Sequence, residues 1–148
     1  MISVSEAQAR LLDLASPLPP IERELMQAVR HYLHAPLTAI RTQPAADLSA
    51  MDGYAIAAGD FPGPWRVIGE SAAGHPFAGA LQSGEAIRIF TGAHVPRNAD
   101  SVLIQENASR DGDILHVTEN RALKIGANIR RLGSDFQAGD QVLPAGSY

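Results

Sequence analysis

The stretch "SAMDGYAI", residues Ser49 to Ile56, begins with small residues, passes through a predicted turn and continues as a predicted strand. Asp52 lies at the neck of the turn, where a carboxylate contributes neither to an apolar core nor to an ordinary solvated face. Gly53 allows another group to approach the backbone closely, and the residues after it have the composition of a strand. The stretch therefore predicts a strand that begins beside a carboxylate.

Further short strands are predicted between about residues 37 and 117, where Gly, Pro, Asn and Asp punctuate the chain. The candidates are "GYAIAA", "WRVIGES", "AIRIFTG", "SVLIQEN" and "ILHVTE". Asp111 and Gly112 in "RDGDI" have the composition of a hairpin turn. Strands at this spacing predict a curled sheet or small barrel.

Helical spacing replaces this pattern near the amino terminus. Ser3 and Glu6 have the spacing of a capping box and predict a helix over residues 4–15. Pro20 can begin a second helix, which Pro36 would end. The apolar residues of that second helix recur every four positions, at Ile21, Leu25, Val29 and Leu33.

These patterns together predict an α+β fold with two amino-terminal helices. We expect residues 1–40 to form a helical segment that packs with residues 122–148. The β-rich lobe, residues 41–121, would be inserted between these two parts. A chain of 148 residues is long enough for one ordinary domain or for two small lobes.

The composition limits the classes of function. The residues are 45% hydrophobic and 19% charged, with a net charge of -4 and no cysteine. A scattered, net negative charge argues against a nucleic-acid surface, and the lack of cysteine excludes disulfides and zinc–thiolate sites. No apolar run approaches the ~20 residues of a membrane span. We therefore expect a cytoplasmic protein that binds neither nucleic acid nor a membrane.

Acidic residues beside turns are the first candidates for chemistry. They are Asp52, Asp100, Glu106 and Asp135. Clustered carboxylates can hold Mg²⁺ through one or two oxygens plus water. Alternatively, each can accept hydrogen bonds from neighbouring amides and simply close its own turn. The sequence leaves both interpretations open.

Two further features suggest anion binding. A strand runs directly into Thr91-Gly92-Ala93, where a hydroxyl and several amides can form a nest for an oxyanion; alternatively, Thr91 closes its own turn. Arg130 and Arg131 can grip a phosphate or carboxylate. Neighbouring strand residues face opposite sides, so one arginine at most would serve a given site. The alternative for this pair is an intramolecular salt bridge.

Three ordered stretches carry a resemblance over nearly the whole chain: "SAMDGYAI", "GESAAGHPFAGALQSGEAIRIFTGAHVPRNADSVLIQE" and "GANIRRLGSDFQAGDQVLPAG". In this order they resemble the amino-terminal part of the molybdopterin molybdenumtransferase (MoeA) family, which includes the E domain of gephyrin. The resemblance implies a transferase of molybdenum cofactor biosynthesis. Its substrates would be molybdate and molybdopterin adenylate, with Mg²⁺ as the metal.

The resemblance also implies roles for single residues. Asp52, Thr91 and Asp135 fall on positions of the family's active cleft and are the catalytic candidates, with Asp52 also as a metal ligand. The substrate-binding candidates are Ser49, Gly92, Glu106 and Arg130. We expect the Asp52, Thr91 and Asp135 turns to converge in space, as one oxygen-rich wall of a cleft.

Full-length members of the family continue into a pterin-binding α/β domain with a "TGDE"-type loop, and then into a small β domain. The resemblance implies a homodimer, and a cleft to which the α/β domain, in cis or in trans, contributes the other wall. The printed sequence does not include those domains. We therefore expect this chain to be inactive or very weak alone, since both substrates must be positioned.

Departures from the family pattern leave a rival interpretation open. Ala46 and Leu48 flank Asp47 where the family has an aromatic and an amide, and Ser134 replaces the glutamate of a "GED" motif. His94 replaces a proline. These changes fit a stand-alone binding or scaffold module with the same fold but no transfer activity. A third interpretation is an unrelated small barrel that binds anions.

Overall fold

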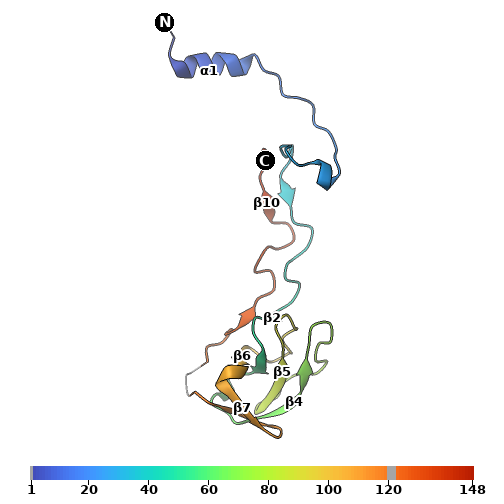
Figure 1. Cartoon of the computed structure of the whole chain (residues 1–148), viewed down its shortest axis with the longest axis vertical. Coiled ribbons are helices and arrows are strands. Elements are labelled where there is room, and N and C mark those ends of the chain that lie inside the picture. The colour runs from blue at the N-terminus through green and yellow to red at the C-terminus, as the bar shows by residue number, and fades with distance from the viewer. Residues whose placement is uncertain (1, 120–122) are drawn as a thin grey trace. The chain divides into compact units, whose positions relative to one another are not determined.

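The structure is a computed structural model that describes residues 2–119 and 123–148. The chain divides into two compact units (Figure 1). Unit 1 comprises Met1–Leu37 and Leu143–Tyr148, and unit 2 comprises Thr38–Val142. The predicted end of the β-rich lobe, at residues 121–122, lies outside the described residues.

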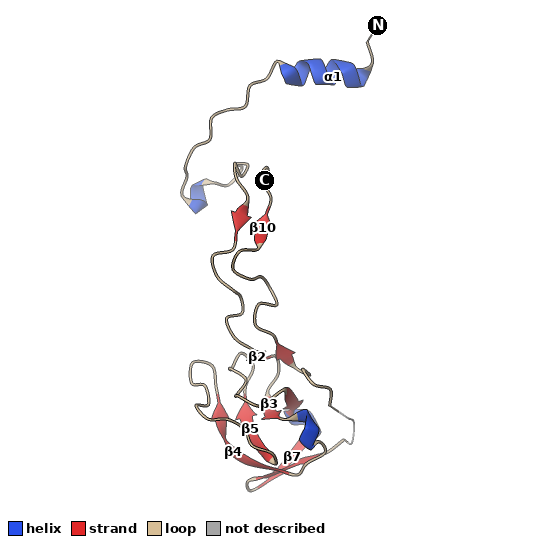
Figure 2. Cartoon of the chain, turned by 180° about the vertical axis from the view of Figure 1, so that it is seen from behind, coloured by secondary structure: helices blue, strands red, loops and turns tan. Residues whose placement is uncertain are grey.

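A curled six-stranded sheet forms most of unit 2, with strand order β6-β3-β5-β4-β8-β7 (Figure 2). Its strands are β3 (Gly53–Ile56), β4 (Trp65–Ser71), β5 (Glu85–Ile89), β6 (Ser101–Ile104), β7 (Ala108–Asp111) and β8 (Ile114–Val117). Every neighbouring pair is antiparallel except β4 and β5, which are parallel. The predicted curled, β-rich lobe is confirmed, although its β7 strand was not among the sequence candidates.

The remaining strands are short pairs. In unit 2, β2 (Leu48–Ser49) pairs with β9 (Ile129–Arg130) in antiparallel fashion. Strands β1 (Leu37–Thr38) and β10 (Gln141–Leu143) pair with each other. Single turns of 3₁₀ helix follow β3 and β6, namely η2 (Ala58–Asp60) and η3 (Gln105–Asn107).

The core of unit 2 lies on both faces of the sheet. One cluster holds the fully buried Ile87 and Ile89 of β5, and the other holds Ala86 of the same strand. This follows from strand geometry, because successive side chains point to opposite faces. Trp65 anchors the second cluster and is 1% exposed. Because both faces of the sheet are buried, its edges and the ends of its strands are exposed to solvent. The candidate residues lie at these exposed positions.

Gly53 is required where β3 meets β6. A Cβ atom at this position would lie 2.0 Å from the carbonyl oxygen of Leu103. No side chain fits at that distance, so glycine permits the two strands to approach. Asp52 immediately precedes this contact and is thereby fixed at the start of the strand.

Unit 1 begins with the helix α1 (Val4–Asp13). As predicted, Ser3 is the N-cap, and its hydroxyl accepts a hydrogen bond from the amide of Glu6 at 3.2 Å. The helix buries none of its residues. At the other end of the unit, the amide of Gly146 donates to the carbonyl of Leu33 at 2.8 Å.

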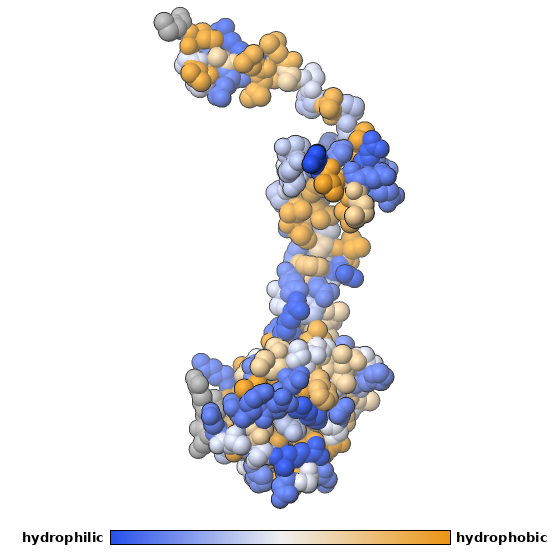
Figure 3. Space-filling model, in the orientation of Figure 1, coloured by the Kyte–Doolittle hydropathy of each residue, from blue (hydrophilic) through white to orange (hydrophobic). Residues whose placement is uncertain are grey.

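The prediction of a second helix, begun by Pro20 and ended by Pro36, is wrong. The structure has only the 3₁₀ turn η1 (Leu25–Gln27) in this segment. Helices gain most of their stability by packing an apolar face, and here the apolar stripe is exposed, with Leu25 at 84%. Arg30 has a φ of 67°, which breaks a right-handed helix. Figure 3 shows exposed apolar residues, in orange, among hydrophilic residues, in blue, in this part of the chain.

No helix among the described residues combines the length and the apolar character that crossing a membrane would require.

Candidate functional site

Asp52 and Thr91 form the centre of the candidate site. The amide and the hydroxyl of Thr91 both donate to Oδ1 of Asp52, each at 2.8 Å. The sheet explains why these residues meet: Gly53 on β3 is paired with Ile89 on β5. The start of one strand therefore lies beside the end of the other, and the two turns face each other.

These hydrogen bonds favour the ionised form of Asp52. The Thr91 amide, followed by the Thr91 hydroxyl, lowers the pKa of the Asp52 carboxyl below its usual value, and the positive charge of Arg88 adds to this effect. Hydrogen bonds donated to a carboxylate favour its charged form. Asp52 is therefore an anion at neutral pH.

Ser49 and Gly92 join the same group through their backbones. The amide of Gly92 donates to the carbonyl of Ser49, and the amide of Ser49 donates to the carbonyl of Ala93, each at 2.9 Å. The Ser49 hydroxyl donates to the carbonyl of Met51 at 2.6 Å, and the residue is only 2% exposed. Ser49 thus closes the turn that presents Asp52.

The amides of the Thr91 turn already have acceptors within the chain. The Thr91 amide donates to Asp52, the Gly92 amide to Ser49, and the Ala93 amide to Phe90. The predicted oxyanion nest therefore holds a carboxylate of the protein. An external oxyanion would have to replace Asp52 to use the Thr91 donors.

Asp135 and Arg130 form a second pair. A guanidinium nitrogen of Arg130, on β9, donates to Oδ2 of Asp135. This bond lowers the pKa of Asp135 and raises that of Arg130. Hydrogen bonds of the described residues thus join Asp135 to Arg130, not to Asp52 or Thr91. The pairing of β9 with β2 places Arg130 opposite Leu48, one residue before Ser49.

The neighbouring arginine has a separate carboxylate, Asp47, which sequence reasoning did not include in the site. A guanidinium nitrogen of Arg131 donates to Asp47 at 2.5 Å, and the amide of Leu132 donates to it at 2.7 Å. The Leu132 bond is the largest cause of the lowered pKa of Asp47, and Arg131 contributes further. Arg130 and Arg131 thus bind different carboxylates, as opposite-facing side chains should, and both form intramolecular salt bridges.

Arg88 and Gln105 are the other residues that sequence reasoning missed. Arg88 donates to the carbonyl of Gly53 at 3.1 Å and to the side-chain oxygen of Gln105 at 2.7 Å. Glu106, a predicted substrate-binding residue, accepts a bond from Gln105 at 3.3 Å. The sequence feature that could have identified Arg88 is a charged residue between two isoleucines in "AIRIF".

The described residues around Asp52, the predicted metal ligand, do not form a complete metal site. Among them, no group of three or more His, Cys, Asp or Glu side chains is placed to hold a metal ion. Both Thr91 bonds end on Oδ1 of Asp52, which leaves Oδ2 for a cation. Mg²⁺ is commonly bound by one or two carboxylates together with substrate phosphates and water. Asp52 fits that mode, with the other ligands supplied from outside these residues.

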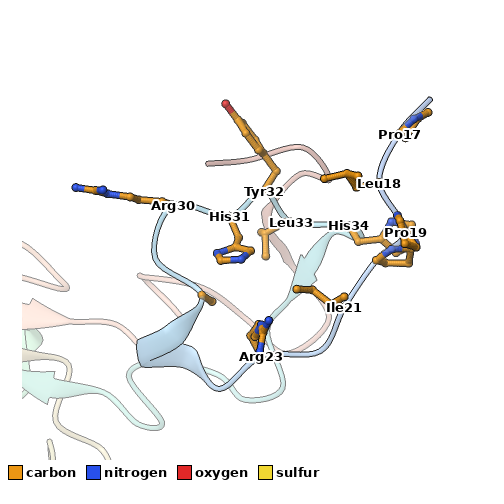
Figure 4. Close-up of a pocket in the computed structure, with 12 residues that line it drawn as sticks. Pro17, Leu18, Pro19, Ile21, Arg23, Arg30, His31, Tyr32, Leu33 and His34 are labelled. Atoms are coloured by element: carbon orange, nitrogen blue, oxygen red, sulfur yellow. The ribbon is translucent and has the colours of Figure 1, made fainter. Parts of the chain in front are cut away.

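A cavity of about 780 Å³ is lined by residues of unit 1 (Figure 4). Its lining combines the proline-rich segment Pro17–Ile21 with the basic and aromatic segment Arg30–His34. It contains none of the predicted site residues, which all belong to unit 2. The candidate site is therefore the turn cluster of Asp52, and not this cavity.

Solved structures with the same fold are known. A crystal structure of a molybdopterin biosynthesis moeA protein from Pyrococcus horikoshii OT3 superposes with a TM-score of 0.76 and 33% identity, covering 83% of this chain and 34% of that chain. A second structure of a moeA protein from Pyrococcus horikoshii has a TM-score of 0.77 at 24% identity, which supports the fold alone.

Related sequences extend over almost the whole chain. The molybdopterin molybdenumtransferase of Haemophilus influenzae is 33% identical over 150 residues, covering 99% of this chain and 37% of the relative. That of Nostoc sp. is 34% identical over 129 residues, covering 82% of this chain and 29% of the relative. The chain thus spans about a third of the length of the curated relatives it matches. Residues 2–148 match the family described as MoeA N-terminal region (domain I and II), and the chain belongs to that family.

Proposed function

We propose that this chain supplies the carboxylate-bearing wall of a molybdenum insertase, which incorporates molybdate into molybdopterin, as its adenylate, in molybdenum cofactor biosynthesis. The observation that carries the proposal is the Asp52 carboxylate, oriented by two bonds from Thr91 at the meeting of β3 and β5. The relatives' name, molybdopterin molybdenumtransferase, supports the reaction class.

In this proposal the Asp52 carboxylate orients Mg²⁺ or a water molecule, and Thr91 fixes its direction. When bound, Mg²⁺ would supply positive charge to oxygens of the reacting groups. Asp135 is the third catalytic candidate, and its bond to Arg130 leaves further N–H donors of the guanidinium and the other carboxylate oxygen for a substrate. Ser49, Gly92, Glu106 and Arg130 remain predicted substrate-binding residues.

The assembly belongs to the same proposal. A homodimer and a pterin-binding α/β domain, in cis or in trans, would supply the opposite wall of the cleft, in the cytoplasm. Since catalysis needs both substrates held in a reactive geometry, the chain alone is expected to show little or no transfer. Adding the α/β domain should restore activity.

The decisive variant is Asp52→Asn, assayed for molybdenum insertion in the chain together with the α/β domain. Loss of the charge should reduce the rate roughly 100-fold, as for other groups that stabilise a transition state electrostatically, with the thermal unfolding midpoint unchanged. Asp113→Asn is the matched control, because that carboxylate is 72% exposed on the β7–β8 hairpin. Full activity of Asp52→Asn would contradict the proposal and favour a binding module.

A further inference from the structure

Arg88 is a cation in the middle of the sheet. It lies on β5 between Ile87 and Ile89, which are fully buried on the opposite face. Directly across from it on β3 is Tyr54. Arg88 is half-buried there, and a cation in such a position is costly unless its charge and its N–H groups are compensated. Its partners therefore indicate what it does.

Aromatic rings and neutral acceptors compensate Arg88. The guanidinium carbon lies 5.2 Å from the centre of the Tyr54 ring and 4.6 Å from that of Phe90, within the range of cation–π attraction. The ion pairs of the described residues do not include Arg88. Its two hydrogen bonds go instead to the Gly53 carbonyl and the Gln105 side chain. The two aromatic rings thus position the planar guanidinium of Arg88, and the guanidinium donates hydrogen bonds to these two acceptors.

Both acceptors belong to the surroundings of Asp52. Gly53 follows Asp52 directly, so the first bond fixes the backbone on its carboxyl-terminal side. The amide of Gln105 donates to the carbonyl of Asp52 at 3.1 Å. The bond from Arg88 to the Gln105 side chain therefore restrains the residue that binds the Asp52 carbonyl. Thr91 restrains the carboxylate itself. The guanidinium therefore restrains the backbone of the turn, and Thr91 restrains its side chain.

The charge of Arg88 acts in the same direction. After the two Thr91 bonds, its positive charge is a further cause of the lowered pKa of Asp52. Two acidic residues on neighbouring elements carry the opposite charge: Glu70, paired with Arg88 on β4, and Glu106 in η3, next to Gln105. Arg88 thus favours the ionised carboxylate while it holds the turn.

We propose that Arg88 is a positioning residue for the transfer reaction, which acts through Asp52 by fixing the turn that presents its carboxylate. It does not contact the substrate. This inference rests on the proposed function, in which the Asp52 carboxylate serves the reaction.

The test compares Arg88→Lys and Arg88→Gln with the wild type, in the chain together with the α/β domain. The control is Arg66→Gln, because Arg66 lies on the adjacent strand β4, is 66% exposed and only approaches Glu85 at 3.6 Å. Steady-state kinetics separate kcat from KM. Hydrogen exchange of the Gln105 amide, which donates to the Asp52 carbonyl, follows the order of the turn directly in the 148-residue chain and needs no active enzyme.

Arg88→Gln should lower kcat by roughly 10- to 100-fold, the range expected when a reacting group is slightly misplaced, with little change in KM. The Gln105 amide should exchange faster in Arg88→Gln and less so in Arg88→Lys, which keeps the charge. Arg66→Gln should change neither kcat nor this exchange. A raised KM with unchanged exchange of the Gln105 amide would overturn the inference in favour of direct substrate contact, and unchanged kcat and exchange would overturn it entirely.

The two proposals fail in distinguishable ways. If Asp52→Asn keeps full activity, the proposed function of Asp52 is wrong, whatever Arg88 does. If Asp52→Asn is inactive but Arg88→Gln retains full kcat, only the positioning role is wrong.

Discussion

A carboxylate that receives two hydrogen bonds from one residue is oriented as well as charged. The amide and the hydroxyl of Thr91 both donate to Oδ1 of Asp52, which restrains the rotation of the carboxylate plane and leaves Oδ2 without a Thr91 donor. A single bond would leave that rotation free. At the scale of the residue, Thr91 is therefore best understood as the partner of Asp52 rather than as an independent anion ligand.

Thr91→Val should raise the pKa of Asp52, because it removes the hydroxyl donor and retains the amide donor and the shape of the side chain. The sign follows from the loss of a bond that favours the ionised form. In an active assembly, the acid limb of the pH–rate profile should therefore shift to higher pH. Carbon-13 NMR titration of the Asp52 carboxyl checks the pKa directly.

Thr91→Ser is the control for this prediction, since it keeps the hydroxyl. Its Asp52 titration should match that of the wild type. An unshifted titration in Thr91→Val would mean that the hydroxyl bond contributes nothing to the charge state of Asp52.

The sequence placed Asp52 and Thr91 separately but could not show that they meet. They are 39 residues apart, and their contact depends on the pairing of β3 with β5. Asp135 differs, because its partner Arg130 is only five residues away in the sequence. This local hydrogen bond joins Asp135 to Arg130 rather than to Asp52 or Thr91. Sequence patterns identify which residues can do chemistry, whereas the register of the sheet decides which of them share a site.

At the scale of elements, the predictable strands were those with marked alternation and turn residues at their ends. The hairpin of β7 and β8 follows directly from Gly112, which adopts a φ of 57°. The parallel pairing of β4 with β5 was not predictable, because both strands would also suit an antiparallel sheet. The prediction of a second helix was wrong for a different reason. The apolar residues recur at helical spacing, but they are exposed in the structure and so cannot stabilise a helix by packing.

Gly53→Ala should destabilise unit 2 at the junction of β3 and β6. The added methyl group would lie 2.0 Å from the Leu103 carbonyl oxygen, so the strands must separate. Overpacking of this kind costs about 1–3 kcal/mol. The free energy of unfolding from urea denaturation measures the loss.

Gly59→Ala serves as the matched substitution, because a Cβ atom there meets no atom within 4 Å. It should leave the free energy of unfolding nearly unchanged. Equal stability of both variants would show that β3 can move away from β6 without cost.

At the scale of the whole molecule, the two units differ in how much of their surface is buried. Unit 2 contains both clusters of the core, while α1 in unit 1 buries no residue. A helix of 10 residues is marginal in water without packing. Local stability should therefore be uneven along the chain.

Hydrogen exchange of the chain alone should show this difference. We expect amides of α1 to exchange at nearly the rate of an unstructured peptide, and amides of β3 and β5 to exchange only on global unfolding of unit 2. Mass spectrometry of peptic fragments distinguishes the two classes. Strong protection of α1 would mean that its apolar side chains are covered in solution, and repeating the measurement at several protein concentrations would reveal whether a second copy covers them.

The pairing of β2 with β9 also bears on how the β-rich lobe could be gained or lost in evolution. Residues 48–49 and 129–130 lie side by side, and Gln43 and Phe136 form a further bridge before and after them. The entering and leaving segments of the lobe are thus separated only by the spacing of paired strands, about 4.8 Å. A short turn could join them, so evolution or an engineer could delete the lobe, or transplant it into another host protein, without stretching the recipient backbone.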